Sequence, residues 1–139
     1  MPTVEFIRLR KPEKAKYLCD LAEDYLEQGK RVLVTVLDEN QAVTLDRFMW
    51  EWKKGSFIPH VYANGAVESL DDPVVIVTDE INPNGAKVLV MGKPCSVDFL
   101  RQFDLVIDFA ELYDDTLAEA SRVRFARYRE VGFAPKMHE

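Results

Sequence analysis

The chain has few of the residues on which metal sites and phosphate-binding enzymes are built. Its 139 residues include two cysteines, two histidines and six glycines. Cys19 and Cys95 form no CxxC pair, which predicts buried or incidental thiols rather than a disulfide or a metal site. The segment VVIVTDE at 74–80 looks like the magnesium-binding strand of a P-loop ATPase. However, the sequence has no GxxxxGK[ST] loop, because its two glycine-lysine pairs, at 29–30 and 92–93, are followed by arginine and proline, so ATP hydrolysis is not expected.

No catalytic constellation stands out either. Ser56 and His60 share a turn, but no glycine-framed elbow surrounds the serine, and a nucleophile also needs an oriented base. A structural role is therefore expected for His60. The other histidine, His138, lies in a segment, residues 133–139, that is expected to be a flexible tail. The sequence predicts no catalytic residue, no cofactor and no metal. A small nucleotide-binding or hydrolytic enzyme remains a rival interpretation, which saturable ATP binding would favour.

Long apolar runs are also missing. No stretch approaches the roughly 18 residues of a membrane span, and the amino-terminal residues lack a signal-peptide core. Hydrophobic residues make up 47% and charged residues 30% of the chain, as in ordinary globular proteins. We therefore expect a cytoplasmic protein with no membrane contact, folded as a single domain over residues 1–139.

Segments with the patterns of strands and helices alternate along the chain. The run RVLVTVL at 31–37 is almost wholly β-branched and aliphatic, which favours a strand covered on both faces. The alternation predicts an α/β fold with three layers, in which helices flank a mostly parallel central sheet. Strands are expected at residues 3–9, 31–37, 74–78, 87–91 and 105–109. Helices are expected at residues 12–28, 39–52, 96–103 and 116–131.

The last helix carries the clearest functional signal. Its sequence, TLAEASRVRFARYREV, contains four arginines, and residues 116–136 have a local charge of +3 in a chain whose net charge is −6. Arg122, Phe125 and Arg129 share one helical stripe, because positions three, four and seven apart lie on one face. The stripe is either an anion-recognising face or a solvated one, and the residues alone leave both open.

The rest of the chain then carries −9, which would repel a polyanion such as DNA. A small cationic patch on an acidic body suits a short acidic peptide better. A module that binds single-stranded DNA directly would use the same arginines, and steep salt dependence in the absence of other proteins would identify it.

A second surface involves Trp50 and Phe57. Trp50 falls off the core stripe of its helix, which is formed by Ala42, Leu45, Met49 and Trp52. Trp50 and Phe57 either pack on each other as a satellite cluster or form an exposed aromatic patch that anchors a partner.

These residues carry a resemblance to a known family. The segments VLVTVLDENQAVTLD (32–46), LDRFMWEWKKGSFIPH (45–60) and LVIDFAELYDDTLAEASRVRFARYREVGF (105–133) resemble the chi subunit of bacterial DNA polymerase III. The resemblance spans most of the chain. It is most specific in the tryptophan followed by an S-F-x-P-H loop and in the R-x-x-aromatic-x-x-x-R helix that ends in Gly-Phe.

The resemblance implies a non-enzymatic, nucleotide-binding-like α/β fold without a phosphate loop. Chi proteins join the psi subunit of the clamp-loader complex to the acidic carboxyl-terminal tail of single-stranded DNA-binding protein (SSB), so contact with DNA would be indirect. The tail site would use Arg122, Phe125 and Arg129, with Arg124 as an additional cation. Family members often have lysines at the positions that Ala118 and Ala126 occupy in this chain. Arg124 and Arg127 are candidates to replace the positive charge of those lysines.

The same resemblance assigns the second surface to a replication partner. Trp50 and Phe57 match the aromatic pair with which chi proteins bind psi. Some chi proteins bind a helicase through this surface, so an adaptor that links SSB to a repair helicase is an alternative function.

Overall fold

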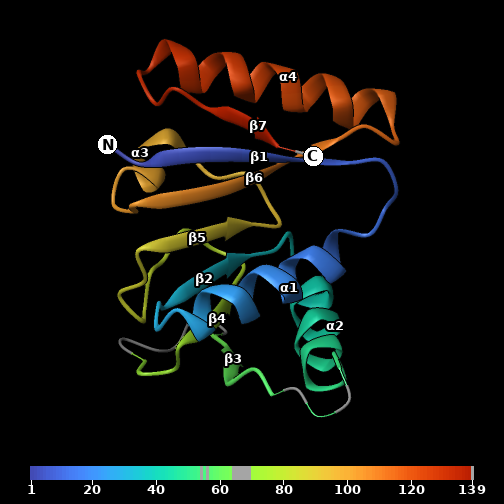
Figure 1. Ribbon diagram of the computed structural model, residues 1–139, viewed down its shortest axis with the longest axis vertical. Helices are drawn as coiled ribbons and strands as arrows, with labels where there is room; N and C mark the ends of the chain where they lie inside the picture. The colour runs from blue at the N-terminus through green and yellow to red at the C-terminus, as the bar shows by residue number, and fades with distance from the viewer. Residues whose placement is uncertain (54, 56, 64–69, 139) are drawn as a thin grey trace.

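The computed structural model describes residues 1–53, 55, 57–63 and 70–138. Over these residues, seven strands form one sheet in the order β3-β4-β2-β5-β6-β1-β7, and every neighbouring pair is parallel. In Figure 1 the strands follow one another in this order from β3 at the bottom to β7 at the top. Their bounds are β1 Thr3–Leu9, β2 Val32–Thr35, β3 His60–Tyr62, β4 Val74–Val77, β5 Val88–Met91, β6 Leu105–Glu111 and β7 Lys136–His138.

The central strands are buried on both faces, as the aliphatic runs predict. All residues of β2, β4 and β5 are buried. In β1 the side chains alternate between the faces, with Val4 and Phe6 in one core cluster and Leu9 in the other. The predicted mostly parallel sheet is confirmed.

Helices cover both faces of this sheet. The helices are α1 Lys14–Glu27, α2 Glu39–Trp50, α3 Val97–Leu100 and α4 Asp115–Glu130. One core cluster joins α1 and α2 to one face of the sheet, and the other joins α3 and α4 to the opposite face. Figure 1 shows α4 running along the end of the sheet that β7 and β1 form, far from α2.

Helices α2, α3 and α4 begin within one residue of their predicted starts, whereas α1 begins at Lys14 rather than at residue 12 and α3 ends at Leu100 rather than at residue 103. The Asp38 side chain accepts the N–H of Gln41, and the Ser96 side chain accepts that of Phe99. Asp114 caps α4 by accepting the N–H of Leu117 at 2.9 Å. Gly132 follows α4 with φ of 90°, the left-handed conformation that glycine adopts without strain.

The carboxyl-terminal segment differs from its predicted flexible tail. Phe133 is buried at 3% exposure, and β7 pairs with β1 over Lys136–His138. The segment is held because Met137 packs against the core cluster that contains Phe6 and Tyr128. The sequence prediction also omits β3, which has only three residues and lies at the other edge of the sheet.

No helix among the described residues is long and apolar enough to cross a membrane.

Candidate functional site

A pocket of about 420 Å³ opens between α4 and the strands beneath it. Helix α4 provides most of its wall, and β1, β6 with the residue after it, and β7 provide the rest. The lining residues are Arg8, Ala110, Leu112, Ala118, Ser121, Arg122, Phe125, Ala126, Arg129, Glu130 and Met137. The structure therefore brings together three of the residues that the sequence assigns to a binding face, Arg122, Phe125 and Arg129.

Phe125 forms part of the apolar floor rather than projecting into solvent. Its ring is half-buried and packs on the fully buried ring of Phe6, with 5.2 Å between the ring centroids. Ala110 and Met137 add further apolar surface beside it. An aromatic side chain entering the pocket would thus meet a ring that the core already holds in place.

Cationic groups border this floor. Arg122 is 66% exposed at its side chain and forms a forked contact with Glu119, with Nε and Nη2 2.9 and 2.7 Å from the same carboxylate oxygen. Arg129 is exposed and has no acidic partner in the part of the chain that the structure describes. Exposed ion pairs contribute only about 0–1 kcal/mol, so a ligand carboxylate can displace Glu119 at little cost.

Arg124 does not join this pocket. It forms a bidentate ion pair with Asp108 of β6, with Nε 2.9 Å and Nη2 3.1 Å from the two carboxylate oxygens. Asp108 is 2% exposed, and it also accepts the Tyr128 hydroxyl at 3.1 Å. The prediction of Arg124 as a binding cation is therefore not supported, because the buried carboxylate already engages its guanidinium.

The Asp108 network has an electrostatic signature. Burial opposes the charged form of Arg124, but hydrogen bonds to Asp108 and the charge of this carboxylate outweigh it and raise the arginine pKa. Burial, followed by the negative charge of Asp108, raises the pKa of Tyr128 above its ordinary value. The hydrogen bonds of Arg124 and Tyr128 to Asp108 hold α4 against β6, so the role of this network is structural.

Sequence reasoning missed two groups of the pocket, Arg8 and Met137. Arg8 comes from β1 and Met137 from β7, which is the neighbour of β1 in the sheet. The alternation of β1 places Arg8 on the side of Val4 and Phe6, and that was the available signal for Arg8. Nothing in the sequence placed Met137, because its segment was expected to be mobile.

Trp50 and Phe57 pack on each other, as the first interpretation of the sequence predicts, and both rings are also exposed. The ring centroids lie 5.6 Å apart, and the indole lies tilted against the His60 ring with 4.7 Å between their centroids. Even so, Trp50 is 56% and Phe57 65% exposed. The two rings pack on each other and still present a large apolar surface.

The residues considered for catalysis have structural partners. The two ring nitrogens of His60 lie 2.6 Å from the Ile58 carbonyl and 3.0 Å from the Asp46 carboxylate. Glu80, from the ATPase-like string, accepts the backbone N–H and hydroxyl of Ser96, and these bonds lower its pKa. Ser56 lies outside the described residues, among which no cluster of metal-ligating side chains is present.

Comparison with known proteins gives consistent matches. The model of the family described as DNA polymerase III chi subunit, HolC, matches residues 1–136. The DNA polymerase III subunit chi of Escherichia coli is 32% identical over 117 residues, which cover 84% of this chain and 78% of that protein. The protein of the same name from Pseudomonas aeruginosa is 29% identical over 120 residues, covering 86% and 82%. That from Haemophilus influenzae is 27% identical over 115 residues, covering 83% and 79%.

Among solved structures, the crystal structure of T4 UvsW matches with a TM-score of 0.73 and 12% sequence identity. The match covers 97% of this chain and 40% of that one. At this identity the likeness concerns the fold alone.

Proposed function

Because the chain belongs to the family of the DNA polymerase III chi subunit, we propose that it is a non-catalytic accessory protein of DNA replication in the cytoplasm. It bridges the acidic carboxyl-terminal tail of SSB to the clamp-loader complex through psi, and it contacts DNA only through SSB. The observation that carries this proposal is the apolar pocket beside α4, bordered by Arg122 and Arg129 on an otherwise acidic chain.

The pocket suggests how a tail would be held. An aromatic residue at the end of the tail inserts between Phe125 and Met137, and its terminal carboxylate meets Arg122 or Arg129. Hydrogen bonds to charged groups contribute roughly 1.5–3 kcal/mol each, so two of them and a buried ring give a dissociation constant on the order of micromolar. Affinity falls with added salt, because the arginines are exposed.

A peptide titration tests the tail site. The purified protein is titrated by calorimetry with the acidic tail peptide of SSB from the same organism and with a peptide that lacks the terminal aromatic residue. We expect micromolar binding of the complete tail peptide and at least about tenfold weaker binding of the truncated one, because the truncated peptide has no ring to place on the apolar floor of the pocket. Equal binding of the two peptides, or none of either, contradicts the proposal.

The same titration separates indirect from direct contact with DNA. The acidic body argues against direct binding, so single-stranded DNA without SSB is expected to bind far more weakly than the tail peptide. Tight binding of the DNA that weakens steeply with salt would identify a DNA-binding module instead.

Trp50 and Phe57 form the second binding surface in this proposal. Exposed aromatic residues that can be covered by a partner are frequent hot spots, and their truncation commonly costs at least about 2 kcal/mol of binding. Trp50→Ala and Phe57→Ala should each weaken binding of psi at least about tenfold and leave tail-peptide affinity unchanged. The measurement is a pull-down or titration with purified psi, alongside the peptide titration.

The effect of these two variants also identifies the protein that binds the second surface. If neither variant affects psi but both lose a copurifying helicase, the adaptor belongs to repair rather than to the clamp loader. Loss of psi binding and tail binding together, in a variant that is still folded, would contradict two separate surfaces.

A further inference from the structure

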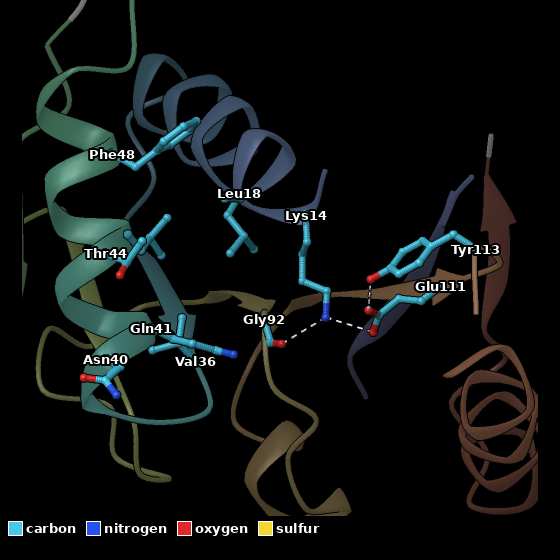
Figure 2. Close-up of a pocket in the computed structure, with 12 residues that line it drawn as sticks. Lys14, Leu18, Val36, Asn40, Gln41, Thr44, Phe48, Gly92, Glu111 and Tyr113 are labelled. Carbon is cyan, nitrogen blue, oxygen red and sulfur yellow. Dashed lines mark hydrogen bonds and ion pairs between the residues drawn. The ribbon is translucent and has the colours of Figure 1, made fainter. Parts of the chain in front are cut away.

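A second pocket, of about 430 Å³, lies on the face of the sheet opposite to α4. Figure 2 shows α1 and α2 on two of its sides and the end of β6 on a third. The walls are largely apolar, and polar groups from α1, α2 and the end of β6 are set around them. Both the volume and this mixture are typical of sites that enclose a small molecule.

The pocket lies at the point of an open parallel sheet where ligands bind most often. After β2 the chain runs into α2 on one face, whereas after the adjacent β5 it runs into α3 on the other. Ligands of doubly wound sheets bind outside the carboxyl ends of two such strands. Val36 follows β2, Gly92 follows β5, and both line this pocket.

The polar end of the pocket is a pre-assembled cluster. The Lys14 amine donates to the Gly92 carbonyl at 3.1 Å and to Glu111 at 2.9 Å, as Figure 2 shows. The Tyr113 hydroxyl donates to the second oxygen of the same carboxylate at 2.6 Å. A carboxylate accepts about four hydrogen bonds, so Glu111, although only 9% exposed, keeps capacity for two further donors.

The cluster does not suit a phosphorylated ligand. The charges of Lys14 and Glu111 cancel, and Gly92 contributes a carbonyl rather than an N–H. The connection from β1 to α1, which would hold a phosphate loop, has no glycine, and its basic residues Arg10 and Lys11 do not line the pocket. The charged side chains that line the pocket therefore give an anion no net attraction.

We propose that this pocket binds an uncharged nucleoside. Glu111 accepts the two ribose hydroxyls, as acidic residues at this edge of nucleotide-binding sheets do. The planar base lies against the apolar wall that Leu18 and Phe48 provide, with its polar edge toward Thr44. This site is separate from the proposed tail site, which lies on the other face of the sheet.

The proposal is tested by titrating the full chain with adenosine and following the amide signals of Gly92 and Lys14 by NMR. We expect saturable shifts with a dissociation constant on the order of a millimolar or below. 2′,3′-Dideoxyadenosine should bind about tenfold more weakly, because it lacks both ribose donors to Glu111. In Glu111→Gln this preference for adenosine should shrink, while the base still binds.

Two variants of α1 locate the site. Ala15 is exposed and lines the pocket, so Ala15→Trp should fill it and abolish the shifts. Lys16→Trp adds the same ring at the neighbouring exposed position, which is outside the lining, and should bind adenosine normally. Thermal unfolding checks that both variants are folded.

Three results would overturn the proposal. No saturable shift with adenosine at millimolar concentration rules out a nucleoside site. ATP binding as tightly as adenosine rules out the uncharged ligand class. Adenosine binding that persists in Ala15→Trp places the ligand elsewhere. If Ala15→Trp does not fold, the comparison of adenosine with its dideoxy analogue on the unaltered chain still decides.

Discussion

Asp108→Ala is expected to lower the free energy of unfolding by about 3–5 kcal/mol, which corresponds to a fall of roughly 10 °C or more in Tm. The Asp108 carboxylate accepts four hydrogen bonds, from Arg124 Nε and Nη2, the Tyr128 hydroxyl and the Phe109 N–H. Alanine leaves the guanidinium, which is 18% exposed at its side chain, without its countercharge. Denaturant unfolding measured by circular dichroism gives the loss directly.

Asp98→Ala is the matched control. Its carboxylate is 99% exposed and lies 3.8 Å from Arg101, so its loss should change stability by less than about 1 kcal/mol. Adding Arg124→Met to Asp108→Ala should recover part of the loss, because no unpaired charge then stays buried. Equal stability of Asp108→Ala and Asp98→Ala would mean that the buried network does not hold α4 on the sheet.

Arg122→Ala is expected to weaken binding of the SSB tail peptide about 10- to 100-fold, the loss of one charge-assisted contact of roughly 1.5–3 kcal/mol. Arg122 lines the pocket, and its guanidinium pairs with the exposed Glu119, its one acidic partner among the described residues. Stability should barely change, since the side chain lies largely in solvent. Calorimetric titration measures the binding and thermal unfolding the stability.

Arg127→Ala removes the same charge from the same helix. Arg127 is 59% exposed and does not line the pocket. Its loss should therefore reduce affinity by no more than about threefold, through the weaker long-range attraction between the helix and the acidic peptide. Similar losses in the two variants would show that the helix attracts the peptide by overall charge. Unchanged binding in both would remove Arg122 from the site.

Much of the fold follows from local patterns. The buried strands 32–35, 74–77 and 88–91 are aliphatic enough to be recognised, and side chains that cap helices, such as Asp38 and Ser96, mark where helices begin. The edge strands β3 and β7 have three residues each, too few for a periodicity to be detected. Their placement depends on the neighbouring strand and on tertiary contacts such as that of Met137, which no local periodicity reveals.

The residues of the proposed binding face were predictable in part for a similar reason. Helical spacing correctly grouped Arg122, Phe125 and Arg129, and the family resemblance, which the family match confirms, pointed to the same residues. Spacing alone does not reveal which arginine faces a buried acid on another element. The polar Asp108 inside the apolar strand LVIDFAE was the signal that a basic partner must lie opposite.

The attachment of α4 at both ends affects the entropy cost of binding a ligand beside it. The helix leaves from β6 and returns into β7, and these two strands flank β1 on either side. The Arg122 and Arg129 backbones therefore keep a fixed separation before any ligand arrives. Binding of the proposed tail would then have to order the peptide and two arginine side chains but no protein backbone, and this preorganisation would favour affinity for a short, otherwise unstructured peptide.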